Sequence, residues 1–249
     1  MKLNCDLGES FGSWTKGLDS AVMPYLDMAN IACGFHASDP LTMAKTVQLA
    51  TQHNVTIGAH PGYQDLVGFG RRSIAYSQDE LIALIQYQIG ALQAICQSQD
   101  NKVHYVKPHG ALYNDMMKDM VIFTCVCQAI SAVDKQLSLV VQAVPDASQL
   151  SAIANQYNIT LLFEAFADRN YLDNGLLVPR NGHADSHQAV LENEEQVIKR
   201  CQHLLTNKTL LSTSGKALPL KVDTLCVHGD NPAAVALVKK LKHLITTQP

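Results

Sequence analysis

Charged residues are scarce in this chain of 249 residues, since Asp, Glu, Lys and Arg make up only 16%, against 47% hydrophobic residues. The formal net charge is -3 and no run of Lys or Arg occurs, which argues against a nucleic-acid partner. No apolar run approaches the length of a membrane span, and Met1-Lys2 leads directly into the first expected strand. These absences predict a cytoplasmic protein, without signal peptide or membrane anchor, whose partners are small molecules or other proteins.

Cysteine spacing offers neither a disulfide framework nor a zinc motif. The seven cysteines are an odd number, and most lie inside apolar runs, as reduced core thiols do. Cys125-Val126-Cys127 is too closely spaced for a CxxC pair, and no second pair accompanies it. We therefore expect these thiols to pack in the core.

Signals for a nucleotide-binding loop or a nucleophilic serine are also missing. The chain contains no GxxxxGK(S/T), no GxGxxG and no GxSxG. If ATP is used, we expect its main site to lie on another polypeptide. No Pro-, Gly- or Ser-rich linker and no shift in composition divides the chain, which predicts a single domain over residues 1–249.

Strand and helix patterns alternate along the whole chain. One helix is predicted to begin at Ser77, where Ser77-Gln78-Asp79-Glu80 forms a capping box, and another after Ser38 or Asp39, with Pro40 in its first turn. Further helices are expected near residues 116–131, 146–156, 188–206 and 231–245. Apolar runs of strand character occupy residues 2–6, 28–33, 55–59, 103–107, 137–143, 159–164 and 223–228. Seven strands alternating with helices predict an α/β fold built on a parallel (β/α) barrel.

Ionisable residues gather where these strands end. Five apolar runs stop at a glycine beside an ionisable side chain: LNCDLGE, ANIACGFH, TIGAHPG, VHYVKPHG and TLCVHGD. In a parallel barrel the carboxyl ends of all strands open on one face, where binding and catalytic groups collect. The residues expected to meet there are Asp6, Glu9, His36, His60, Lys107, His109, His228 and Asp230.

The first three strands offer groups for metal binding or general-base chemistry. Alternation along the first strand sends Asn4 and Asp6 to the same face, and Glu9 follows in the loop. Asp6, His36 and His60 together would suit a divalent metal with open coordination positions. Each histidine could equally be a hydrogen-bonded structural residue.

Two cationic segments are candidates for anion binding. Lys107-Pro108-His109-Gly110 places a lysine at a strand end, where it would stabilise a developing oxyanion while His109 transfers a proton. Arg71-Arg72 would bind a carboxylate or a phosphate, with one arginine expected in the site and the other structural.

The residues that follow the last two predicted strands include both functional and structural candidates. Glu164, Asp168 and Arg169 follow the sixth strand, where an internal ion pair among them is expected, and the polar stretch 165–187 is typical of a functional loop. After the seventh strand, Asp230 is expected to cap the final helix while His228 stays a catalytic candidate.

The same segments resemble the signature blocks of the LamB/YcsF family: LNCDLGESFG, ANIACGFHASDP, IGAHPGYQDLVGFGRR, VKPHGALYN, EAFADRNY and CVHGDNP. The resemblance implies a distorted seven-stranded barrel related to the glycoside hydrolase/deacetylase superfamily. It also implies ATP-dependent hydrolytic opening of 5-oxo-L-proline to L-glutamate, with ATP and Mg²⁺ as cosubstrate and two further subunits, B and C. Two departures stand out, namely Ser38 at a position where the family usually has glycine, and the polar continuation after Arg180.

Such a reaction needs a general base, an acid for the ring nitrogen and cations for anionic groups. We hypothesise that Asp6 or Glu9 is the base, that His109 or His228 is the acid, and that Lys107 binds anionic groups with an arginine. The residues expected to contact substrate or phosphate are Asn4, His36, His60, Arg71, Arg72, Glu164 and Arg169. Two alternatives are a stand-alone metal-dependent amidohydrolase or deacetylase, and a non-catalytic assembly subunit.

Overall fold

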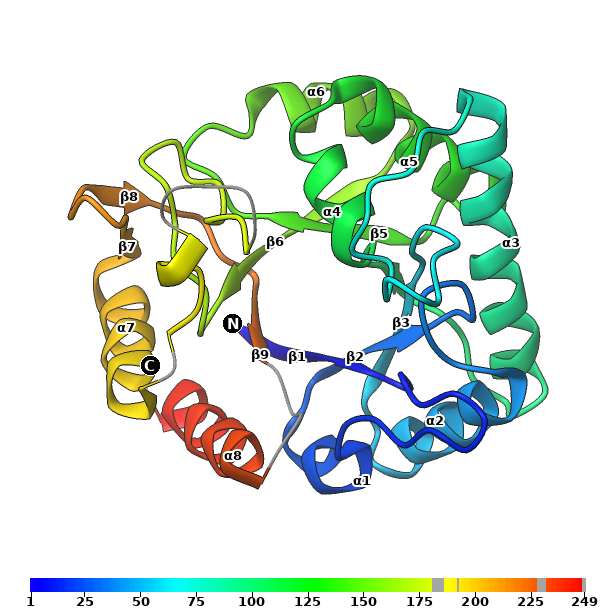
Figure 1. Ribbon diagram of the computed structural model, residues 1–249, viewed down its shortest axis with the longest axis horizontal. Coiled ribbons are helices and arrows are strands. Elements are labelled where there is room, and N and C mark those ends of the chain that lie inside the picture. The colour runs from blue at the N-terminus through cyan, green and yellow to red at the C-terminus, as the bar shows by residue number, and fades with distance from the viewer. Residues whose placement is uncertain (181–185, 192, 228–231, 248–249) are drawn as a thin grey trace.

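Seven parallel strands close into a barrel in the order β1-β2-β3-β4-β5-β6-β9. A computed structural model describes residues 1–180, 186–191, 193–227 and 232–247. The strands form the central ring seen in Figure 1, and the helices surround it. Their bounds are β1 Lys2–Leu7, β2 Met28–Ala32, β3 Thr56–His60, β4 Tyr105–Val106, β5 Ser138–Gln142, β6 Thr160–Phe166 and β9 Thr224–Val227. The predicted seven-stranded parallel barrel is therefore confirmed.

The strands read as continuous apolar runs because helices cover the outside of the barrel and side chains fill its inside. β2 and β9 are buried along their whole length. Inside the barrel, Met28, Tyr105 and Val140 form a small apolar layer. Gly58 on β3 makes room for it, since a Cβ atom there would lie 2.1 Å from the Tyr105 ring. Packed side chains thus fill the barrel at this level.

The long helices begin at the predicted caps. Ser77 and Glu80 form the expected capping box of α3, and the Asp39 carboxylate accepts hydrogen bonds from the first turn of α2, with Pro40 at its first position. The helices are α1 Asp19–Val22, α2 Pro40–Gln52, α3 Gln78–Gln97, α4 Gly110–Met116, α5 Met120–Val133, α6 Ser148–Gln156, α7 Glu194–Asn207 and α8 Pro232–Thr247, with short 3₁₀ turns η1 at Met23–Tyr25 and η2 at Ser186–Gln188.

Two local predictions need correction. The single helix expected near 116–131 is two helices, because the Asp119 carboxylate caps a new helix, α5, at Val121 N. The helix expected over 188–206 begins later, at Glu194, where Asn193 is the N-cap. After α7 ends at left-handed Lys208, an antiparallel pair that the sequence did not predict follows, β7 Thr209–Leu211 and β8 Ala217–Pro219.

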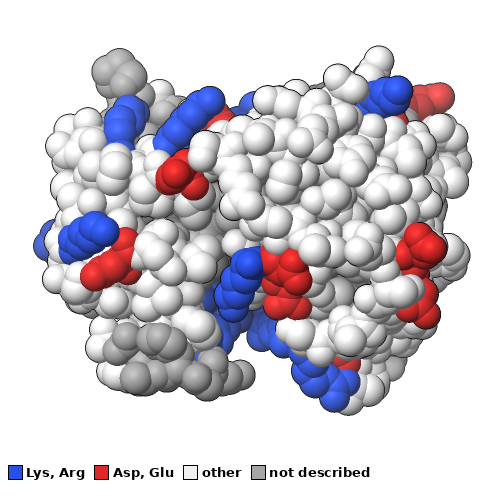
Figure 2. All heavy atoms as spheres, turned by 90° about the horizontal axis from the view of Figure 1, so that it is seen from above, with Lys and Arg blue, Asp and Glu red and all other residues white. Residues whose placement is uncertain are grey.

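Charges on the surface are sparse and mixed in sign. Figure 2 shows Lys and Arg side chains in small groups on the face in view, several of them beside Asp or Glu. Among the described helices, no single one is long and apolar enough to cross a membrane; α4 and α5 pass the length and composition test only as a pair bent by 113°. Buried residues of that pair, including Leu112 and Phe123, belong to the core.

Candidate active site at the carboxyl ends of the barrel strands

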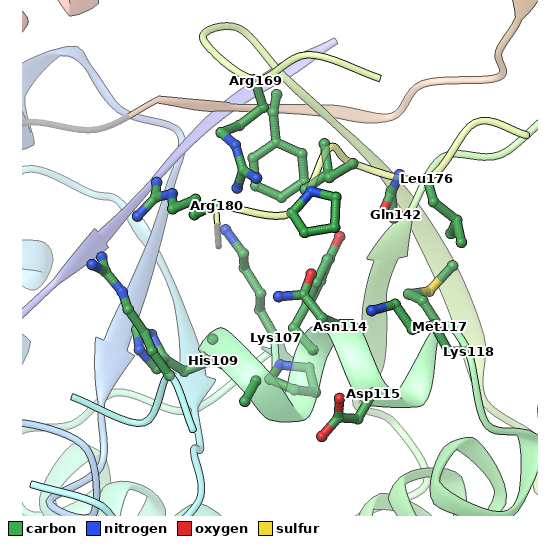
Figure 3. A pocket seen from close by; sticks show the side chains of 18 of the residues that line it. Lys107, His109, Asn114, Asp115, Met117, Lys118, Gln142, Arg169, Leu176 and Arg180 are labelled. Carbon is green, nitrogen blue, oxygen red and sulfur yellow. The ribbon is translucent and has the colours of Figure 1, made fainter. Parts of the chain in front are cut away.

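A pocket of about 580 Å³ opens at the carboxyl ends of the strands. In Figure 3, Lys107, Arg169 and Arg180 lie around it, and Asn114 and Asp115 project from α4. Many of its walls come from loops that follow β3, β4 and β6. Its polar lining residues are Asp6, His60, Arg71, Ser73, Lys107, His109, Asn114, Asp115, Lys118, Gln142, Arg169 and Arg180.

Lys107 is the centre of a buried polar network across the barrel. Its side chain follows β4 and is only 3% exposed, yet its ammonium lies 3.0 Å from Asp6 Oδ1 and 2.8 Å from Glu164 Oε1. Burial alone would lower the pKa of Lys107, but Asp6, Cys226 and Glu164 outweigh it and raise that pKa well above its ordinary value. Lys107 is therefore a permanent cation held between two carboxylates.

Amides and hydroxyls complete this network. Asn30 Nδ2 donates to Asn4 Oδ1 and to Asp6 Oδ1, both at 2.8 Å, while Tyr113 donates its hydroxyl proton to Glu164 Oε2 at 2.9 Å. Asn4 and Asp6 do share one face of β1, as their alternation predicted. We call Asn4, Asp6, Asn30, Lys107 and Glu164 the lysine network.

A second group lies directly beside the lysine network, with His60 Nε2 3.4 Å from Asp6 Oδ2. Its members are Glu9, His36, His60 and His109, which we call the histidine cluster; one ligand atom from each lies within 4.8 Å of the others, so the group could hold a metal ion. The sequence-based metal set of Asp6, His36 and His60 differs from this one in having Asp6 instead of Glu9 and in lacking His109.

His60 and His109 are both fixed through backbone carbonyls. His60 Nδ1 lies 2.6 Å from the Lys107 carbonyl oxygen, and His109 Nε2 lies 2.9 Å from the Phe69 carbonyl oxygen. The remaining nitrogens, His60 Nε2 and His109 Nδ1, are 3.0 Å apart. Both His109 nitrogens are thus engaged within the protein, which disfavours the hypothesis that His109 protonates a substrate.

His36 is buried without a hydrogen bond from either ring nitrogen to any described residue. Its ring stacks on His109 with centroids 3.7 Å apart and an interplanar angle of 3°. Burial, followed by the charge that His60 carries when protonated, lowers the pKa of His36 well below its usual value. The loop after β3 shapes this place, because a Cβ on Gly70 would lie 2.7 Å from His36 Cβ.

The two adjacent arginines have different surroundings. Arg71 lines the pocket, whereas Arg72 forms a salt bridge with Asp65. This is the division expected for neighbouring side chains that point in different directions.

Arg169 also lines the pocket, but its side chain donates hydrogen bonds to the carbonyl oxygens of Val178 and Ala189. Burial lowers its pKa to about 10. Glu164 forms its ion pair with Lys107, so Arg169 is not the partner of that carboxylate. Arg169 thereby orders the loop after β6 that covers the pocket.

Some predicted site residues lie outside the described part of the chain, and some residues at the site were not predicted. His228 and Asp230 lie outside the described residues. Asn30 is a polar residue in the middle of the apolar strand β2 and is the register partner of Asp6 on β1. A polar residue inside an apolar strand was a usable signal in the sequence. The polar pocket residues that were not predicted from the sequence are Ser73, Tyr113, Asn114, Asp115, Lys118 and Gln142.

Fold and pocket together define a parallel (β/α)-barrel protein with its polar site at the strand ends. The chain belongs to the LamB/YcsF family, whose model matches residues 1–249. It is 51% identical over 242 residues to the protein of Vibrio cholerae serotype O1 that is named as the A subunit of 5-oxoprolinase, covering 97% of this chain and 96% of the relative. It is also 51% identical over 246 residues to the protein of that name from Pseudomonas fluorescens, covering 99% and 97%.

Solved structures agree with this placement. The lactam utilization protein from Thermus thermophilus superposes with a TM-score of 0.89 at 34% identity, covering 99% of this chain and 96% of that one. A putative cellobiose-phosphate cleavage protein from Enterococcus faecalis reaches a TM-score of 0.57 at 9% identity, with 99% and 94% covered. The second likeness reflects the barrel fold alone.

Proposed function

We propose that this chain is the A subunit of a 5-oxoprolinase, which opens the lactam ring of 5-oxo-L-proline to L-glutamate in an ATP-dependent reaction with subunits B and C. The observation that carries the proposal is the pocket itself, where the partly buried carboxylate of Asp6, the ammonium of Lys107 and several arginines converge. The identity of 51% to relatives named as that component of 5-oxoprolinase supports the choice of substrate.

Ring opening forms a C–O bond and breaks the C–N bond of the lactam. Phosphorylation of the carbonyl oxygen by ATP releases ADP and makes the carbon electrophilic. One water adds to this carbon and the nitrogen leaves with a proton, which gives an acyl phosphate. A second water then hydrolyses the acyl phosphate to the carboxylate of glutamate and free phosphate. Asp6 lines the pocket and is placed to take the proton of the water and to return it to the nitrogen. Lys107, 3.0 Å from Asp6, stabilises negative charge that develops on oxygen.

The substrate also carries a carboxylate, for which the pocket offers cations. Arg71 and Arg180 lie at the pocket with Lys118, and their guanidinium or ammonium groups suit a carboxylate or phosphate oxygen. Since Lys107 is already balanced by Asp6 and Glu164, these three side chains are the better candidates for substrate anions.

Partners B and C supply what this chain lacks. The sequence has no glycine-rich phosphate loop, so we place the main ATP·Mg²⁺ site on one of these partners, and the whole complex in the cytoplasm. Large apolar side chains are exposed on the loops that follow β1 and β3, with Trp14 at 73% and Val67 at 93% exposure. These loops leave the pocket face, which suits docking of a partner there.

Reconstitution tests the proposal. Glutamate release from 5-oxo-L-proline is measured with the purified chain alone, with subunits B and C alone, and with all three, each with and without ATP·Mg²⁺. We expect release only from the full set with ATP. Equal release from B and C without this chain would overturn the proposal.

The histidine cluster favours one second candidate, a stand-alone metal-dependent amidohydrolase or deacetylase. In that case the purified chain loaded with a divalent metal would hydrolyse amide substrates without ATP. The same assay series, with added N-acetylated sugars, separates the two functions.

A further inference from the structure

The tautomers of His60 and His109 leave two lone pairs facing each other. A neutral imidazole has one N–H group, and a carbonyl oxygen can only accept. His60 therefore carries its proton on Nδ1, donating to Lys107 O at 2.6 Å, and His109 carries its proton on Nε2, donating to Phe69 O at 2.9 Å. His60 Nε2 and His109 Nδ1 are then both acceptors, although they are only 3.0 Å apart. Such an arrangement requires a cation near both nitrogens, either a proton on one of the two rings or a metal ion.

A metal ion satisfies this requirement better than any described side chain does. Bond lengths of about 2.0–2.1 Å place two histidine nitrogens on a tetrahedral zinc ion roughly 3.3 Å apart, a little farther than the 3.0 Å between the two nitrogens here. Glu9 Oε1 lies 3.8 Å from His109 Nδ1, which puts an anionic oxygen within reach of the same point. Metal-binding histidines typically donate their other N–H to a backbone carbonyl, as both rings do here.

His36 belongs to this site in a different way. Its ring is parallel to that of His109 at a centroid distance of 3.7 Å, so one ion cannot lie in both ring planes. His36 Nε2 lies 3.6 Å from Glu9 Oε1, and neither His36 nitrogen has a hydrogen-bond partner among the described residues. A small shift of the Glu9 carboxylate lets His36 donate to it, which would orient that ligand.

We propose that His60 Nε2, His109 Nδ1 and the Glu9 carboxylate bind one divalent transition-metal ion, such as Zn²⁺, and that His36 positions Glu9. Two imidazoles and one carboxylate leave coordination positions open. These face the pocket, which His60 and His109 line, beside Asp6. An ion there would hold a water molecule and lower the pKa of that water. The proposal concerns binding by this chain and does not depend on the 5-oxoprolinase assignment.

Calorimetric titration of the chelator-treated, purified full chain with Zn²⁺ tests it. We expect one ion per chain with micromolar or tighter affinity, and no comparable binding of Mg²⁺, because imidazole ligands favour transition metals. A Co²⁺-loaded sample should show visible bands that report nitrogen ligation. Absence of stoichiometric Zn²⁺ binding, or equally tight Mg²⁺ binding, would overturn the proposal.

Variants distinguish ligands from the positioning residue. His60→Asn and His109→Asn should abolish measurable Zn²⁺ binding, whereas His36→Asn should weaken it about 10- to 100-fold, as loss of an outer partner does. His53→Asn is the matched control, since His53 is exposed at the end of α2. Circular dichroism verifies folding of every variant.

Glu9→Gln keeps the proposal testable if the histidine variants fail to fold, because it removes one charge at a partly exposed position. It should also weaken Zn²⁺ binding strongly. Unchanged affinity in folded Glu9→Gln or His109→Asn would contradict the assignment. Nuclear magnetic resonance offers a second check. If a proton is shared between the His60 and His109 rings both in the metal-free chain and after addition of Zn²⁺, the assignment is wrong.

Discussion

The lysine network and the histidine cluster lie side by side at the same end of the barrel, yet they differ in how their polar atoms are satisfied. Lys107 contacts carboxylates, an amide and a thiol within 3.2 Å. His36, equally buried, has no hydrogen bond to a described residue, and two nitrogens of the other rings face each other at 3.0 Å.

This difference separates a site prepared by the protein from a site that awaits something else. A buried network whose charged groups are paired and hydrogen-bonded holds its groups in place before substrate arrives. A buried cluster with unsatisfied nitrogens is stable only if a ligand, a proton or an ion completes it. Substitutions should therefore cost much stability in the lysine network and change it little in the histidine cluster.

Removal of Lys107 should have the largest effect on stability. Lys107→Met leaves Glu164 and Asp6 without their buried cation, which should lower the free energy of unfolding by about 3–5 kcal/mol. Urea denaturation measures this, with exposed Lys102→Met as the control. A loss below about 1 kcal/mol would show that the network is not balanced by this ion pair.

Replacement of His36 should sharpen the contrast. His36→Leu removes two unsatisfied nitrogens at nearly constant volume, so the metal-free chain should change in stability by less than about 1.5 kcal/mol in either direction. The same urea titration measures it. A loss as large as that of Lys107→Met would mean that the His36 nitrogens have partners in solution.

Asp39 supports the histidine cluster from outside. Its carboxylate caps α2 and accepts a hydrogen bond from Gly12 N at 3.0 Å, in the loop that follows Glu9. Asp39→Ala should cost about 1 kcal/mol of stability at neutral pH.

The pH dependence of that loss has a definite sign. Hydrogen bonds from Gly12 and Thr42 lower the pKa of Asp39 from its ordinary 3.8 to about 2. A lowered carboxylate pKa stabilises the fold above the ordinary value, and this contribution is lost as pH falls toward 2. The difference between the wild type and Asp39→Ala should therefore shrink from pH 4 to pH 2. A constant difference over this range would contradict the capping role.

Ser38 should give the smallest effect. It adopts a left-handed backbone with φ of 77°, a conformation that glycine adopts without strain. Ser38→Gly should raise stability by up to about 1 kcal/mol, measured as a higher thermal midpoint. Asn54→Gly is the control, because asparagine tolerates its φ of 54°. A lower midpoint for Ser38→Gly would contradict the strain.

The convergence of His36, His60, Lys107 and His109 was predictable from sequence because parallel strands open on one face. Apolar runs ending in glycine marked five of the seven strand ends, and the predicted ranges lie close to those observed. The short β7–β8 pair was not predictable, because three-residue strands leave almost no periodic signal.

The sequence did not predict which side chains pair with each other at the site. Lys107 follows β4 and Glu164 lies on β6, two strands away in the barrel, so no local pattern encodes their ion pair. Glu9 joins the histidines because Gly8 adopts a φ of 68°, a left-handed conformation in which the chain turns just after β1. Such partnerships depend on backbone geometry and rotamers, so sequence reasoning identified the residues at the site but paired them differently.

Glutamate release by the complex reconstituted with Asp6→Asn tests most directly whether the lactam ring opens in this pocket. Asparagine keeps the acceptor for Asn30 but cannot take a proton, so the rate should fall by roughly 100- to 10,000-fold. Asp115→Asn, which changes another acid lining the pocket, should retain most of the activity. A folded Asp6→Asn variant that releases glutamate at the wild-type rate would contradict this role of the pocket.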